Sequence, residues 1–104
     1  MPNEYSPARR FPRFAVDLLA IRANAPPRLD RVVNLSRGGA LLVTRAALPV
    51  GTVHTFLFIM PGRESRSAVA AVEAVVAWSG VTQLGLQFRV VHELVEQYLA
   101  RLAG

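Results

Sequence analysis

The chain has 104 residues, of which 52% are hydrophobic, so it is long and apolar enough to fold as one domain around a single core. Cysteine is absent, which excludes disulfides, thiolate metal sites and cysteine nucleophiles. The net charge is +5 and all twelve basic residues are arginine, a residue that binds phosphate with a planar fork of donors, so the composition favours an anionic partner.

The N-terminal segment combines prolines with basic residues. Residues 1–8 contain two prolines, and we expect them to form a flexible arm ahead of a single domain over residues 9–104. Arg9 and Arg13 follow at a spacing of four, and Pro12 favours an extended backbone between them. Two guanidiniums on such a segment can close over an anionic ligand. A solvated basic tail is the alternative interpretation.

Six apolar segments bounded by turn residues predict strands. They cover residues 14–23, 28–34, 39–44, 53–60, 67–78 and 81–90. The fifth segment is ambiguous, because its alanines favour a helix and its alternating valines favour a strand; we interpret it as a strand. Trp78 ends the apolar face of that strand and is interpreted as a core residue, with a platform for base stacking as the alternative. Residues 91–102 place apolar side chains at helical spacing and predict a helix that caps a small closed barrel, with partner binding as its alternative role.

Several polar residues are assigned no chemistry. We expect Asp17, Asp30 and Arg31 to point outward as solvated charges. His54 has no metal-binding partner at ligand spacing, so we interpret it as a histidine on the strand surface and expect no metal. Ser36 has no nearby histidine to activate it. Without a nucleophile–base pair, a metal cluster or a phosphate-binding loop, the sequence predicts a binding module that is not an enzyme and needs no cofactor.

Targeting signals are not found in the sequence. Its first residues lack the apolar core and cleavage site of a secretory signal, and no apolar run approaches eighteen residues. We therefore expect a cytoplasmic protein that does not insert into a membrane.

A polar turn within residues 31–44 joins the second and third predicted strands. Asn34 and Ser36 are two residues apart, so their side chains point to the same face of an extended chain. Gly38 and Gly39 can adopt positive φ and let another molecule approach the backbone closely. An amide and a hydroxyl beside backbone N–H groups suit an anionic, hydrogen-bonding ligand. Alternatively, the two polar side chains only close an Asx or Ser turn.

Together, these segments resemble a known family. Arg9-x-x-x-Arg13, followed by Asn34-x-Ser36-x-x-Gly39, resembles the RxxxR and [D/N]xSxxG motifs with which PilZ domains bind cyclic di-GMP. Residues 84–88 look like the last barrel strand of that family, so the resemblance covers nearly the whole chain. It implies a mainly β fold, a six-stranded antiparallel PilZ-like β-barrel with a C-terminal α-helix.

The resemblance also implies the site and the mechanism. The residues expected to bind cyclic di-GMP are Arg9, Arg13, Asn34, Ser36 and Gly39, with Arg10, Arg37 and Gly38 as additional candidates. Closure of the arginine arm would transmit binding to an unidentified downstream protein. A PilZ-like adaptor that does not bind the dinucleotide is one alternative. A small barrel that binds nucleic acid is another, although the strands lack interleaved aromatic residues for stacking successive bases.

Overall fold

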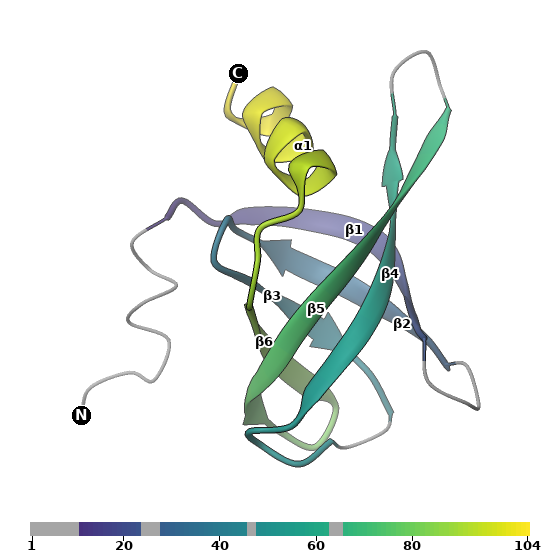
Figure 1. Ribbon diagram of the computed structural model, residues 1–104, viewed down its shortest axis with the longest axis vertical. Helices are drawn as coiled ribbons and strands as arrows, with labels where there is room; N and C mark the ends of the chain where they lie inside the picture. The colour runs from purple at the N-terminus through teal and green to yellow at the C-terminus, as the bar shows by residue number, and fades with distance from the viewer. Residues whose placement is uncertain (1–10, 24–27, 46–47, 63–65) are drawn as a thin grey trace.

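The fold is seen in a computed structural model, which describes residues 11–23, 28–45, 48–62 and 66–104. The strands are β1 (Phe14–Arg22), β2 (Arg28–Leu35), β3 (Gly39–Val43), β4 (Val53–Pro61), β5 (Ser67–Ser79) and β6 (Gln83–Phe88), and α1 (Glu93–Ala103) is the helix (Figure 1). The predicted fold class is confirmed, and each element lies within two residues of its expected ends. The arm predicted for residues 1–8 lies outside the described residues.

The six strands form a closed antiparallel barrel in the order β1-β2-β3-β6-β5-β4. The ambiguous fifth segment is a strand because it has a partner on each side: it pairs with β4 from Val53–Val75 to Pro61–Ser67, and with β6. Pairing between β1 and β4, from Leu19–Ile59 to Arg22–Phe56, closes the ring. Closure leaves the central strands without a free sheet edge and defines an inner and an outer face.

Side chains that alternate along the strands fill the interior with aliphatic and aromatic groups. The largest fully buried ones are Phe56, Phe58, Leu35, Leu42, Met60, Leu84, Leu86, Val32, Val72, Val76 and Val95. The helix α1 lies over one end of the barrel and buries Val95 and Leu99 in this core, as a capping helix should (Figure 1). His92 caps its N-terminus, since the imidazole Nδ1 accepts a 3.0 Å hydrogen bond from the backbone N–H of Leu94. Among the described residues, no helix has the length and hydropathy needed to cross a membrane.

One ion pair lies inside the barrel. Asp30 is buried and its Oδ2 lies 3.5 Å from Nη2 of the buried Arg22, so the expectation that Asp30 points outward is wrong. Alternation places Asp30 on the same face of β2 as the buried Val32, and the arginine that neutralises it there comes from the neighbouring strand β1. Asp17 and Arg31 are exposed as expected, and they pair through two hydrogen bonds of 2.9 and 3.1 Å.

His54 lies near this ion pair. It is two residues before the buried Phe56 on β4, so its side chain belongs to the inward-facing set of that strand, near the strand's start, where it remains partly exposed. The ring is partly buried, and Nε2 lies 2.9 Å from the Thr52 hydroxyl. Burial lowers the pKa of His54 below its ordinary value of 6.5, and the positive charge of Arg22 lowers it further.

This lowered pKa predicts a loss of stability in mild acid. The unfolded chain takes up a proton at His54 near pH 6.5, whereas the folded chain does so only at lower pH. The contribution of His54 to the free energy of unfolding should therefore be constant above pH 6.5. It should fall as the pH drops below 6.5 towards the pKa of the folded state. Urea denaturation between about pH 5 and about pH 8 measures this dependence.

The His54→Gln variant, which cannot titrate, is the matched control. It should show a flatter pH dependence than the unmodified chain over the same range. Curves that run parallel for the two proteins would contradict a role for His54.

Candidate functional site

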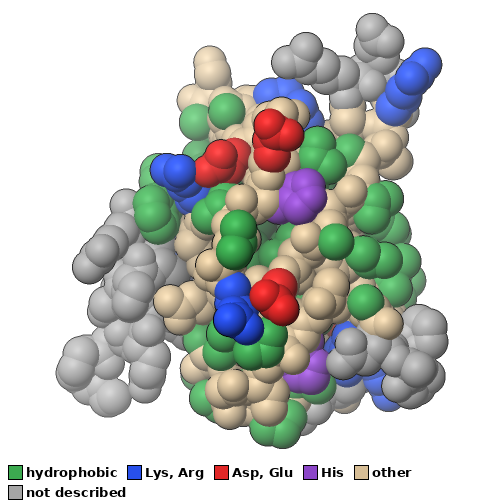
Figure 2. Space-filling model, in the orientation of Figure 1, with side chains coloured by type: hydrophobic (Ala, Val, Ile, Leu, Met, Phe, Trp, Pro, Cys, Tyr) green, Lys and Arg blue, Asp and Glu red, His purple; other side chains and the backbone are tan. Residues whose placement is uncertain are grey.

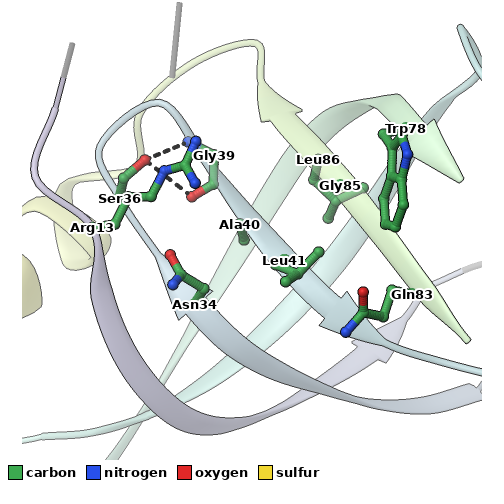
Figure 3. A pocket seen from close by; sticks show the side chains of 10 residues that line it. All are labelled: Arg13, Asn34, Ser36, Gly39, Ala40, Leu41, Trp78, Gln83, Gly85 and Leu86. Carbon is green, nitrogen blue, oxygen red and sulfur yellow. Dashed lines mark hydrogen bonds between the residues drawn. The ribbon is translucent and has the colours of Figure 1, made fainter. Parts of the chain in front are cut away.

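A pocket of about 240 Å³ lies on the outside of the barrel, over the seam between β3 and β6. It is lined by Arg13, Asn34, Ser36, Gly39, Ala40, Leu41, Trp78, Gln83, Gly85 and Leu86. Figure 3 shows Arg13 beside Ser36 at one rim and Trp78 with Gln83 at the other, with Leu41 between them. Segments from the start, middle and end of the chain thus meet at one place.

Ser36 holds the turn that forms one wall of the pocket. Its Oγ accepts hydrogen bonds from the backbone N–H groups of Gly38, at 3.1 Å, and Gly39, at 3.2 Å. The N–H of Ser36 donates to the carbonyl of Gly39 at 2.9 Å, which closes the connection between β2 and β3. The Ser turn considered as an alternative is therefore present, and the same side chain also lines the pocket.

Gly39 is needed for close backbone packing. A Cβ at this position would collide with the carbonyl oxygen of Leu86 on β6. Neither Gly38 nor Gly39 uses the positive φ that is open to glycine: among the described glycines, left-handed φ values occur at Gly51 and Gly104. Glycine serves here to bring two strands together beneath the pocket.

Trp78 forms the far wall of the pocket. The sequence predicted a core residue at this position, and that prediction is wrong. The pairing of β5 with β6 shifts register between Val76 and Trp78, which is the mark of a β-bulge. The extra residue turns Trp78 out of the inward-facing set, so the indole lines the pocket opposite Gly85. The ring also packs against the β5–β6 turn, where a Cβ at Gly80 would come within 2.8 Å of it.

The polar groups of the pocket suit an anion that also carries hydrogen-bonding edges. The exposed guanidinium of Arg13 supplies a positive charge, while Asn34 and Gln83 supply carboxamides that both donate and accept. Aspartate and glutamate are absent from the described residues that line it. Elsewhere too, the described part of the chain contains no cluster of three or more His, Asp or Glu residues that could hold a metal ion.

Arg37 points away from the pocket, towards the helix. Its Nη2 lies 2.8 Å and its Nε 2.9 Å from Oε2 of Glu96 on α1. Its guanidinium also lies 5.9 Å from the centre of the Phe11 ring, which precedes β1. Arg37 thus connects the turn of the site to the helix and to the segment that leads into the barrel.

The predicted site residues are therefore divided. Arg13, Asn34, Ser36 and Gly39 line one pocket, whereas Arg37 and Gly38 do not. Arg9 and Arg10 lie outside the described residues. Whether these residues bind a ligand stays a prediction.

Sequence reasoning missed several lining residues, chiefly Trp78, Gln83 and Leu41. A signal existed for the first of them, since a tryptophan directly before a Ser-Gly turn is well placed to leave the core.

Comparisons with known proteins agree with the fold. The family model described as PilZ domain matches residues 7–103. The inhibitor of motility MotI/DgrA of Bacillus subtilis has a similar structure, with a TM-score of 0.75 and 16% identity over 91% of this chain, which spans 51% of that chain. The PilZ domain of YcgR from Escherichia coli, solved with c-di-GMP, has a TM-score of 0.67 and 20% identity, covering 90% of this chain and 87% of that one. The search of curated proteins found no match.

The turn geometry predicts that Ser36→Ala destabilises the fold. Removing Oγ leaves the N–H groups of Gly38 and Gly39 without their acceptor, which should lower the free energy of unfolding by about 1–3 kcal/mol. Urea denaturation checks the effect, with Ser67→Ala at the exposed start of β5 as the control. Equal denaturation midpoints for the two variants would show that the hydroxyl does not hold the turn.

Proposed function

Because this chain belongs to the PilZ domain family, we propose that it is a receptor for cyclic di-GMP that passes the signal to a separate protein and catalyses no reaction. The observation that carries the proposal is the convergence of Arg13, Asn34, Ser36 and Trp78 on one pocket. The structural similarity of this chain to a PilZ domain solved with c-di-GMP supports the same ligand.

The pocket fits part of the ligand well. Its volume of about 240 Å³ is below the roughly 300–1,000 Å³ of drug-sized sites, so it can take one guanine base while the rest of the dinucleotide lies over the rim. In our proposal the Trp78 indole stacks on that base, and Asn34 bonds its edge. Arg13, together with Arg9 of the same motif, pairs with the phosphates.

The first prediction from this assignment concerns affinity. Arg9→Ala and Arg13→Ala should each weaken cyclic di-GMP binding roughly tenfold or more, because each removes a charge-assisted contact worth about 1.5–3 kcal/mol. Trp78→Ala should cost a similar amount, since stacking of one base on an aromatic ring is worth about 1–3 kcal/mol. Calorimetric titration with cyclic di-GMP measures these losses, with GTP and GMP as control ligands.

Arg66→Ala is the matched control, because this exposed arginine does not line the pocket. It should leave the affinity unchanged. Equal affinities for the Arg9, Arg13 and Trp78 variants and the unmodified chain would refute the assigned site.

The contact of Arg37 with Glu96 supplies a route from the site to the helix. We place the ligand phosphates close to the turn that carries Arg37, where they compete with the Glu96 carboxylate for the same guanidinium. Binding would thus release α1 from the turn and change the surface that a partner protein meets. Reciprocity then requires that loss of the ion pair should favour the ligand.

A second prediction tests this coupling. Glu96→Gln should tighten cyclic di-GMP binding roughly two- to fivefold, because an exposed ion pair of about 0.5–1 kcal/mol no longer holds Arg37. The gain should vanish when Arg37→Ala is also present. Calorimetry on the unmodified chain, the two single variants and the double variant measures this. Asp17→Asn breaks the exposed ion pair with Arg31 and serves as the control. An equal gain in that variant, or a gain that persists without Arg37, would rule out the competition.

An adaptor that does not bind the dinucleotide is the second candidate. Two contacts favour it: the Ser36 hydroxyl is used by its own turn, and Arg37 is held by Glu96. A flat titration of well-folded protein with cyclic di-GMP would support this candidate over the receptor.

A further inference from the structure

The polar side chains that the pocket offers to a bound base are carboxamides. Figure 3 shows Asn34 and Gln83 on either side of Leu41, so the floor of the pocket has an amide at each side. Within the described residues, no hydrogen bond holds either of these amides. Both are therefore available to a ligand, and each presents an acceptor oxygen beside an NH2 group that donates.

The other hydrogen-bonding groups of the pocket are already engaged. The Ser36 hydroxyl accepts from the N–H groups of Gly38 and Gly39, and it donates to the carbonyl of Gly39 at 3.4 Å. Strand β3, which forms the floor, is paired with β2 on one side and with β6 on the other, so its backbone groups bond within the sheet. The proposed function assigns the Arg13 guanidinium to the phosphates. Recognition of the base edge therefore falls to the two carboxamides.

The difference between a carboxamide and a carboxylate decides which purine is selected. Guanine presents two adjacent donors, N1–H and the N2 amino group, and a carboxylate, which only accepts, can bond both. Adenine presents its N6 amino group beside the acceptors N1 and N7, which a carboxylate repels. A carboxamide bonds adenine through N6 and N7, and after a half-turn it bonds guanine through N1–H and O6. The terminal torsion of such a side chain has two broad minima, so this half-turn costs little.

Carboxylates, which would select guanine, are used elsewhere in the described structure. Asp17, Asp30, Glu73 and Glu96 each lie against an arginine that does not line the pocket. Figure 2 shows this arrangement on one face of the molecule, where acidic side chains adjoin arginines. Because the described lining contains no aspartate or glutamate, the pocket has no group there that excludes adenine.

The strand register places an amide and the indole in the same row of the outer surface. Asn34 is opposite Leu41 on β3. Leu41 is opposite Gly85 on β6, which is opposite Trp78 on β5. A base that stacks on the indole thus lies over an apolar floor in the row that ends at the Asn34 amide. Stacking itself adds little selectivity, because every base has a π-face.

We infer, on the basis of the proposed function, that this site binds cyclic dinucleotides of adenosine as well as those of guanosine, because carboxamides alone read the base. The Asn34 amide turns to match either purine, and Trp78 stacks on its face. The phosphates, which the two ligands share, pair with the arginines. The site thus selects a purine on a cyclic dinucleotide backbone, and it does not select guanine.

Calorimetric titration of the whole chain with cyclic di-AMP and with cyclic di-GMP compares the two purines directly. The two dissociation constants should agree within about tenfold, because a bidentate contact is made to either base. A preference for cyclic di-GMP of more than about tenfold would overturn this inference and leave the receptor assignment intact. Binding of neither ligand would contradict the receptor assignment itself, and the inference with it.

Asn34→Asp tests the amide at the base. The carboxylate should weaken cyclic di-AMP roughly tenfold or more relative to cyclic di-GMP, since it repels the ring nitrogens of adenine and accepts from both guanine donors. Its charge also repels the phosphates of both ligands, so the measured quantity is the ratio of the two dissociation constants. Gln83→Glu makes the same exchange on the other side of the floor and should shift the ratio in the same direction. It also serves if Asn34→Asp does not fold.

Val81→Glu is the matched control for charge, because Val81 is 94% exposed in the turn between β5 and β6 and does not line the pocket. It should leave the ratio of the dissociation constants unchanged. An unchanged ratio in both Asn34→Asp and Gln83→Glu, or an equal shift in Val81→Glu, would overturn the inference. Circular dichroism verifies that each variant is folded.

Discussion

The short pairing of β1 with β4 is the contact on which the rest of the molecule depends. It runs from Leu19–Ile59 to Arg22–Phe56, and it turns a six-stranded sheet into a ring. Once the ring is closed, each strand has one row of side chains inside and one outside, and the inside rows form a core of aliphatic and aromatic groups. The helix α1 completes this core at one end, through Val95 and Leu99.

The closed barrel also sorts its outer surface into two regions with different chemistry. One seam carries a cationic and amide-bearing pocket, whose turn is held by Ser36 and whose two strands are brought together at Gly39. The opposite seam, between β1 and β4, carries paired aliphatic residues, among them Leu19 and Ile59. The shared core fixes both seams, so the two regions lie on opposite sides of the barrel. Only Arg37 and its contact with Glu96 connect the pocket's turn to the helix among the described ion pairs.

The sequence predicted the six strands, the helix and the residues Arg13, Asn34, Ser36 and Gly39 of the pocket, because period-two patterns and motif spacing are local properties. It failed where the outcome depends on a second strand. Trp78 follows the apolar alternation of β5 and leaves the core only because the β5–β6 register shifts before it. The sequence likewise predicts a solvated charge at Asp30, because the buried arginine that pairs with it, Arg22, lies on another strand.

The buried pair of Arg22 and Asp30 has a consequence for how the chain avoids misassembly. The two residues belong to adjacent strands, and Nε and Nη2 of the arginine with Oδ2 of the aspartate form no hydrogen bonds within the described structure, so the pair adds little net stability. A β1–β2 hairpin that slipped by one residue would, however, bury one charge without the other, at a cost of several kcal/mol. The pair thus destabilises a misaligned hairpin more than it stabilises the correctly aligned one.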